Sequence, residues 1–185
     1  MIRQYLLDNY TNIEVRLSRE FDAFLDLSDR AQKANTWGAD IFVSIHINAG
    51  GGTGFESFVH TNASANAVKL QNYIHSEVIK ATGFTDRGLK RANFAVLRLS
   101  KMPAILTENG FIDNINDANK LRDKTFLQKI AIAHAEGIAK AFGLQKKRPT
   151  RLYKVQVGAF IDRKNAERLV DELKSKGYNA FIKEE

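Results

Sequence analysis

The chain has 185 residues and a formal net charge of +7, with 28 basic against 21 acidic residues. Hydrophobic residues make up 44% and charged residues 26%, a balance typical of folded rather than disordered proteins. The absence of cysteine excludes a disulfide framework, a thiolate zinc site and a cysteine nucleophile. No apolar run reaches the roughly 18 residues that a membrane span requires. Charged residues within positions 1–15 argue against a cleavable signal peptide.

The first third of the chain alternates helical and strand patterns. Residues 2–10 resemble the last two turns of an amphipathic helix, so we expect the chain to start after the opening strand that an α/β domain usually has. The alternation at 12–17 predicts a half-buried strand. A helix is expected at 28–37, capped by Ser28 or a polar neighbour. The nearly continuous β-branched run at 40–47 predicts a strand covered on both faces.

Further strands and helices follow from residue 54 onward. Strands are expected at 54–60, 93–99 and 103–107. Ser64 is expected to cap a helix, and Thr125 with Gln128 forms a capping-box pattern at the start of another. Strands interleaved with helices predict an α/β fold with a mostly parallel sheet between helices. Helical spacing marks the apolar stripes of the two helices: Ala67, Leu70, Ile74 and Val78 in one, Leu127, Ile130, Ala131, His134, Ile138 and Ala141 in the other.

A basic, proline-containing run at 145–151 divides the chain. It predicts a linker between a domain at 1–144 and a small unit at 152–185. In that unit a strand at 152–158, a helix closed by Gly177 and a strand at 178–182 would form a βαβ piece. About 35 residues bury little core by themselves, so a packing appendage or a partly ordered tail is the alternative.

Two predicted strands end in polar side chains with catalytic potential. The strand ending in SIHIN places His46 and Asn48 on one face, and the strand at 103–107 runs into Glu108. Ligands of open α/β sheets gather at the carboxyl ends of strands. Imidazole is a common zinc ligand, and a neighbouring carboxylate is a usual general base. A core histidine and a surface acid would explain each residue singly, but their coincidence favours a site.

These motifs carry a family resemblance. SIHINAGGGTGFESFVH (44–60) and RGLKRANFAVLRLSKMPAILTENGFIDN (87–114) resemble the zinc-dependent N-acetylmuramoyl-L-alanine amidases, over about residues 1–143. The resemblance implies a peptidoglycan hydrolase that cleaves the amide between N-acetylmuramic acid and L-alanine, with His46 as a zinc ligand and Glu108 as the catalytic residue. It also implies two further ligands, a histidine in a GHGG-like loop and a glutamate entering the first helix, both upstream of Met1. With His46 alone, zinc binding is expected to be weak, and the alternative is an impaired amidase that binds peptidoglycan.

The remaining polar residues receive smaller roles. Asn48 is expected to orient the His46 ring, and Glu56 to act as an orienting or substrate-side carboxylate. His60 is the first substitute ligand to consider, although an exposed histidine at a strand end is the simpler explanation, and His75 and His134 are expected to be packing or interface residues. The glycines at 50–52 and 54 lack the order of a phosphate-binding loop, so we expect a flexible substrate-facing loop or a tight turn.

The tail carries a second resemblance. LYKVQVGAF (152–160) and NAERLVDELKSKGYNAFI (165–182) are similar to one half of a SPOR domain, a peptidoglycan-binding module. The implied partners are peptidoglycan and anionic cell-wall polymers, which fits the positive charge. The implied location is the cell wall or the extracellular space, without a recognisable signal peptide, and the alternative is the cytoplasm until release. A nucleic-acid partner is not expected, because no basic stripe with interleaved aromatic residues occurs.

Overall fold

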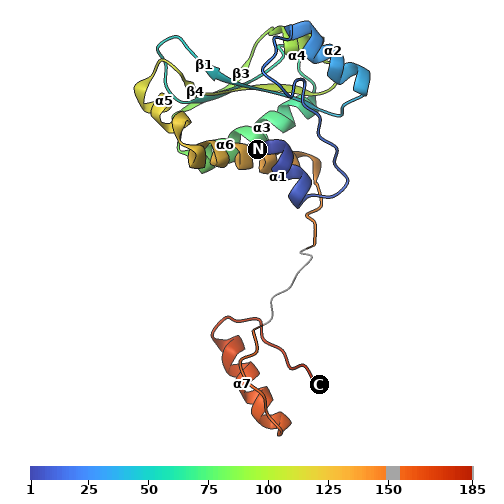
Figure 1. Cartoon of the computed structure of the whole chain (residues 1–185), viewed down its shortest axis with the longest axis vertical. Helices are drawn as coiled ribbons and strands as arrows, with labels where there is room; N and C mark the ends of the chain where they lie inside the picture. Colours follow the sequence, from blue (N-terminus) through green and yellow to red (C-terminus); the bar gives the residue numbers. More distant parts are fainter. Residues whose placement is uncertain (149–154, 185) are drawn as a thin grey trace. The chain divides into compact units, whose positions relative to one another are not determined.

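The computed structural model describes residues 1–148 and 155–184 (Figure 1). These residues fall into two compact units, Met1–Lys147 and Arg148–Glu185. We describe each unit by itself. No helix among the described residues is long and apolar enough to cross a membrane.

A four-stranded sheet forms the centre of the first unit. Its strands, in spatial order, are β1 (Phe42–Asn48), β4 (Ala104–Phe111), β2 (Phe55–Val59) and β3 (Asp86–Arg91). β1 runs parallel to β4 and β2 parallel to β3, whereas β2 and β4 are antiparallel. The expected α/β fold is therefore confirmed, with one antiparallel pairing in an otherwise parallel sheet.

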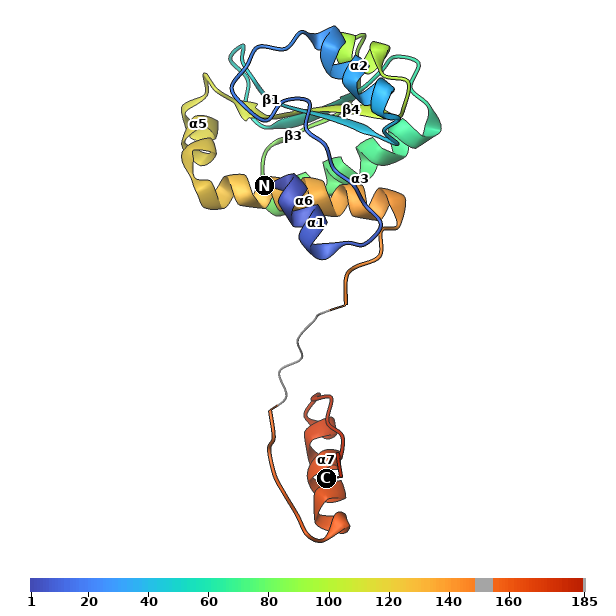
Figure 2. The same cartoon turned by 45° about the vertical axis from the view of Figure 1, so that its right-hand side comes forward.

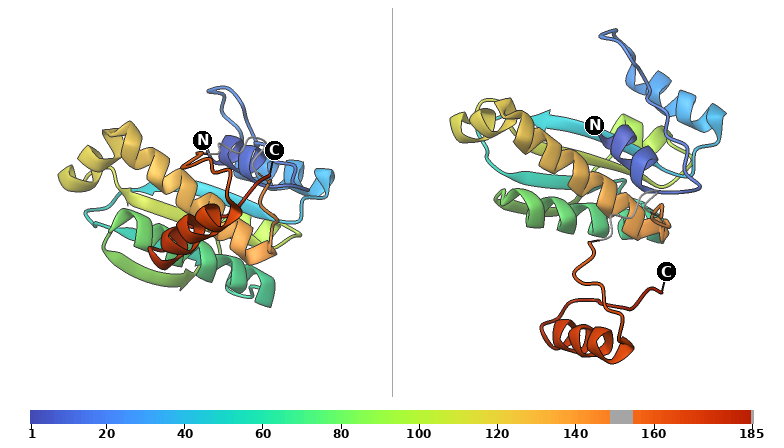
Figure 3. Two further views of the ribbon diagram at one scale, coloured as in Figure 1. Left: turned by 90° about the horizontal axis from the view of Figure 1, so that it is seen from below. Right: turned by 60° about the horizontal axis from the view of Figure 1, so that its bottom comes forward.

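Helices cover both faces of the sheet (Figures 1 and 2). One face carries α3 (Ala65–Thr82) and α6 (Lys124–Phe142), which lie side by side in both views of Figure 3, and α1 (Ile2–Asn9) packs on α6. The other face carries α2 (Leu27–Trp37) and α4 (Ala95–Leu99), while α5 (Ile115–Arg122) leads from β4 into α6. The main core fills the space between the sheet and α1, α3 and α6; its fully or nearly buried members include Leu6, Phe55, Leu70, Ile74, Ile105, Ile130 and Ile138.

Side-chain caps define where the long helices begin. The Ser64 side chain accepts a hydrogen bond from the Ala67 backbone N–H, as expected for an N-cap. The expected capping box of Thr125 and Gln128 is wrong, because α6 starts one residue before Thr125 with Asp123 as its cap. The apolar stripes assigned to both helices are buried or partly buried.

Two expected strands are wrong. Residues 12–17 form no strand; Ile13 and Val15 pack against the main core from an extended segment. Residues 95–99 form α4 instead of a strand, and Val96 and Leu97 of this helix pack against β4. The missing strand is β3, whose sequence DRGLKR is too charged for the apolar alternation that identifies half-buried strands.

β1 also differs from its expected burial. It lies at an edge of the sheet, and Ile45 and Ile47 are 45% and 48% exposed, so the strand is not covered on both faces. Its β-branched residues indicate a strand, but they do not indicate how many strands or helices pack against it.

Within residues 155–184, the described part of the second unit forms one helix, α7 (Arg163–Ser175), which is capped by the Asp162 side chain. The described parts of the two expected strands, 155–158 and 178–182, make no strand pairing, and residues 152–154 lie outside the described part. No residue of α7 is buried. A helix and two extended segments of this length have too few apolar contacts to form a core between them.

Candidate active site

Three polar side chains lie in one row across the sheet. His46 on β1 is in register with Glu108 on β4, and Glu108 is in register with Glu56 on β2. Residues opposite each other on neighbouring strands point to the same face, with Cβ atoms about 5 Å apart in an antiparallel pair. The structure thus brings together His46 and Glu108, as their positions near strand ends predicted, and adds Glu56 beside them.

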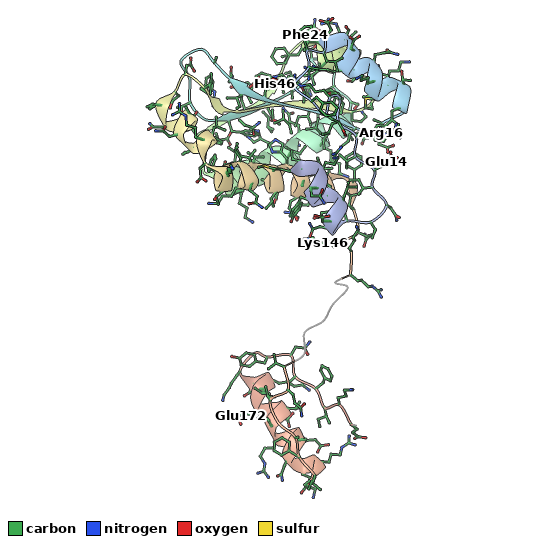
Figure 4. All side chains as sticks on the ribbon, viewed as in Figure 1. Glu14, Arg16, Phe24, His46, Lys146 and Glu172 are labelled. Atoms are coloured by element: carbon green, nitrogen blue, oxygen red, sulfur yellow. The ribbon has the colours of Figure 1, made fainter. Side chains whose placement is uncertain are left out.

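The row lies on the face of the sheet that carries α2 and α4, where Figure 4 shows His46. Val96 and Leu97 of α4 pack on Leu106 and cover this face toward the amino end of β4. Beyond α4 the face is open, so His46 is exposed and Glu108 is half-buried. A substrate can therefore reach the row from the solvent.

Glu108 lies at the centre of the row, between His46 and Glu56. Its Oε2 atom is buried and has no hydrogen-bond partner among the described residues. Desolvation, followed by the nearby charge of Glu56, raises the pKa of Glu108 to about 7. A carboxyl group with such a pKa can both accept and donate a proton near neutral pH, which is what general acid–base catalysis requires.

His46 is oriented by Ser44 and not by Asn48. The His46 Nε2 atom lies 2.9 Å from the Ser44 hydroxyl oxygen, two residues earlier on the same strand face. Desolvation and then the charge of Arg30 lower the pKa of His46, which favours the neutral imidazole. The expectation that Asn48 orients this ring is corrected: the Asn48 side-chain amide donates instead to Glu56 Oε1 at 2.8 Å.

Glu56 is only 4% exposed, and its carboxylate is fully used. Besides the Asn48 amide, it accepts hydrogen bonds from Arg87 Nε, at 2.8 Å, and from Lys90 Nζ. Burial acts to raise the pKa of Glu56, but the hydrogen bonds and charges of Lys90 and Arg87 outweigh it and leave the pKa below its usual value. Both cations come from β3, the strand that sequence patterns missed.

The glycine-rich loop after β1 is held by two aspartates. Gly50 and Gly51 donate their backbone N–H groups to one oxygen of Asp113, at 2.7 and 2.8 Å. Asp117 accepts from the Gly54 N–H at 2.9 Å. Gly54 has a φ of +101°, and a Cβ there would lie 2.1 Å from the Thr85 carbonyl oxygen. Because these hydrogen bonds hold the glycine loop in place beside the row, they do not support the expectation of a flexible loop.

The other histidines lie away from the row. His75 is buried between Ser57 and Asp86, and His134 is fully buried against Thr107, both on the face covered by α3 and α6. The expectation that they are packing residues is confirmed. His60 follows the far end of β2 and faces Asn93 at 3.2 Å, and β2 is antiparallel to β4, so the chain carries His60 away from Glu108.

Sequence comparison assigns the first unit. Residues 1–140 match the family described as N-acetylmuramoyl-L-alanine amidase, and residues 149–185 match the SPOR domain. The chain belongs to the N-acetylmuramoyl-L-alanine amidase family. This amidase is 49% identical over 181 residues to a sporulation-specific N-acetylmuramoyl-L-alanine amidase of Bacillus subtilis, a match that covers 98% of the chain and 71% of that protein. It is 48% identical to the amidase CwlM of Bacillus licheniformis, with the same coverage.

Solved amidase structures have the same fold as the first unit. The catalytic domain of CwlV, an amidase of Paenibacillus polymyxa, superposes with a TM-score of 0.73 at 33% identity, covering 78% of this chain and 80% of that one. An amidase of Clostridium difficile superposes with a TM-score of 0.74 at 32% identity, covering 77% and 78%. Both confirm a central sheet flanked by helices.

The described residues of this amidase do not make a complete zinc site, although the family is generally zinc-dependent. A catalytic zinc ion takes three protein ligands and one open position. Across the described part of the chain, no three histidine or acidic side chains converge in a way that could hold a metal ion. The row offers one imidazole, and Glu108 is the carboxyl group suited to proton transfer, so two of the three protein ligands are lacking.

Proposed function

We propose that this chain is a peptidoglycan hydrolase that cleaves the amide bond between N-acetylmuramic acid and L-alanine, with Glu108 as its proton-transfer residue. The observation that carries the proposal is the buried Glu108 Oε2, which has no hydrogen-bond partner among residues 1–148 and 155–184 and lies at the centre of a row of polar side chains that is open to solvent. Membership of the amidase family supports the substrate, because the matched relatives are named for this reaction.

The proposed step uses one water molecule and leaves no atom unaccounted for. Glu108 accepts a proton from water while the water oxygen bonds to the amide carbonyl carbon. The same carboxyl then donates that proton to the alanine nitrogen as the carbon–nitrogen bond breaks. The products are the lactyl carboxylic acid of the sugar, which keeps the second hydrogen of the water until it ionises in solution, and a peptide with a free alanine amino group.

His46 is proposed as a metal ligand on the strength of the family resemblance, with Ser44 holding its ring. Since the row supplies fewer than three ligands, we propose that this chain by itself holds zinc weakly. Because the family is generally zinc-dependent, the assay described below supplies zinc.

The second unit is proposed to hold the enzyme on its substrate. Residues 149–185 match the SPOR domain, and the net charge of +7 adds attraction to anionic polymers of the wall. We therefore propose that the chain acts at the cell wall.

The test compares Glu108→Gln with Glu14→Gln on purified peptidoglycan, with zinc supplied. Glu14 is an exposed glutamate that forms an ion pair with Arg16, so it provides the same chemical change away from the row. Newly exposed alanine amino groups are counted by end-group labelling. We expect the Glu108 variant to lose about 10²–10⁴-fold in rate while the Glu14 variant keeps it.

Two results would contradict the proposal in different ways. Near-full activity of the Glu108 variant would reassign the proton-transfer role, with Glu56 as the next carboxylate in the row. No release of alanine amino groups by the unmodified chain would favour the alternative, an impaired amidase that only binds peptidoglycan.

A further inference from the structure

Two cations extend the row onto β3. Asp86 and Arg91 of this strand are in register with Phe55 and Val59, on the face covered by α3. Lys90 is in register with Phe58, and the Arg87 side chain reaches Glu56, so both lie on the face of the catalytic row. Across the sheet, the row therefore reads imidazole, carboxyl, carboxylate and then two cations.

Glu56 does not use up these cations. Arg87 donates only its Nε–H, and no described residue accepts from its two terminal nitrogens. The guanidinium lies over the Phe111 ring at 4.8 Å, and the side chain is 34% exposed. Lys90 is 37% exposed. When Glu108 is protonated, the two positive charges face only the Glu56 carboxylate, which leaves one positive charge in excess beside the terminal nitrogens of Arg87.

An arginine in this state is suited to bind a carboxylate. The terminal nitrogens of a guanidinium form a planar fork that matches the two oxygens of a carboxylate. The Glu56 bond and the Phe111 ring fix the Arg87 side chain in advance, so little conformational entropy is lost on binding. The single excess charge suits a ligand with one negative charge.

We propose that Arg87 and Lys90 form a carboxylate-binding subsite for the leaving peptide of the substrate. The inference rests on the proposed hydrolysis at Glu108. With Glu108 at the scissile amide, the positions of the two cations lead us to place the peptide that begins with alanine toward β3 and the acyl sugar toward His46. A carboxylate of that peptide then reaches the cations, and the subsite selects acidic peptides and sets the direction in which the substrate binds.

The test measures binding and not turnover. The ligand is N-acetylmuramoyl-L-alanine with a free carboxylate, compared with its carboxamide, in the full chain carrying Glu108→Gln so that neither ligand is consumed. Dissociation constants come from titration calorimetry or from chemical-shift changes. We expect the carboxylate to bind about tenfold more tightly than the carboxamide, and high salt to reduce the preference.

Substitutions on β3 test which residues cause the preference for the carboxylate ligand over the carboxamide. Arg87→Gln should bring the ratio of the two dissociation constants close to one, whereas Arg87→Lys should keep part of it. Arg91→Gln is the matched control, because Arg91 lies on the same strand but on the opposite face and donates to the Thr61 carbonyl. Circular dichroism checks folding, and Lys90→Gln provides a second variant with the same expected direction should Arg87→Gln unfold.

Several outcomes would overturn the inference. These are equal affinity of the parent chain for both ligands, no binding of either ligand, or an unchanged ratio in the Arg87→Gln and Lys90→Gln variants. None of them bears on whether peptidoglycan is hydrolysed, which the alanine end-group assay decides separately. Conversely, a carboxylate preference in a chain that releases no alanine would sustain the subsite while the hydrolase proposal fails.

Discussion

Glu56 and Glu108 face each other across β2 and β4, yet their environments move their pKa values in opposite directions. Glu56 is surrounded by an amide and two cations, which keep it ionised despite burial. Glu108 has no such donors, so burial and the neighbouring charge keep its proton available near pH 7. Two neighbouring titratable groups whose pKa values are shifted in opposite directions are common in acid–base catalytic sites.

His134 shows the same physics in the core, where it affects stability. The ring is fully buried between Thr107 and the Ile130 carbonyl, and desolvation lowers its pKa to about 4. Below the unfolded-state pKa of roughly 6.5 the unfolded chain gains a proton that the folded chain refuses, so stability falls as the pH drops toward 4. When the pH is lowered from 7 to 5, this histidine should reduce the free energy of unfolding by about 2 kcal/mol.

The measurement is urea unfolding of the wild-type chain and His134→Gln at both pH values. Glutamine can bond to the same neighbours but does not titrate, so its stability should fall by about 2 kcal/mol less than that of the wild type. Other titrating groups contribute equally to both proteins. Parallel losses in the two proteins would show that His134 is not the group responsible.

At the scale of elements, patterns of apolar spacing predicted α3, α6, β2 and β4 but failed for β3. Long amphipathic helices and buried strands repeat their signal many times over. β3 is a short edge strand in which Arg87 and Lys90 pair with the Glu56 carboxylate, so charged residues replace the apolar alternation that identifies strands. His46 and Glu108 could be found from strand ends, whereas Arg87 and Lys90 depended on a strand that the sequence does not reveal.

The contact between α3 and α6 gives a prediction at this scale. Gly137 of α6 lies against Ile74 of α3, and a Cβ at residue 137 would come within 2.6 Å of the Ile74 Cα. Alanine is favoured over glycine inside a helix by about 1 kcal/mol, but here the two backbones must separate. We expect Gly137→Ala to destabilise the chain by about 1–3 kcal/mol, measured by urea unfolding. Lys129→Ala, on an exposed position of the same helix, should stay within about 0.5 kcal/mol of wild type; a stabilising Gly137→Ala would show that the helices can move apart freely.

At the scale of the whole molecule, the two units differ in how they are stabilised. The first has a buried core on each face of its sheet, and its ends are joined where Tyr10 pairs with Lys146 and the Thr11 N–H donates to the Gln145 carbonyl. The second buries no residue of its only described helix and exposes several large apolar side chains: Val155, Val157, Phe160, Ile161, Tyr178 and Phe181. Removal of the second unit should therefore leave the fold of the first intact.

Deleting residues 148–185 separates binding from folding. This cut keeps the Tyr10–Lys146 bridge, and we expect the circular dichroism melting curve of the remaining unit to stay cooperative. Co-sedimentation with insoluble peptidoglycan should weaken, because the exposed aromatic residues and the basic approach around Arg148 are lost. The difference between the full and shortened chains should shrink at high salt, since contacts between exposed charges are screened over about 8 Å near physiological ionic strength. Equal sedimentation of the two forms at every salt concentration would place peptidoglycan binding in the first unit, where the carboxylate subsite at Arg87 would then be the main anchor to be tested.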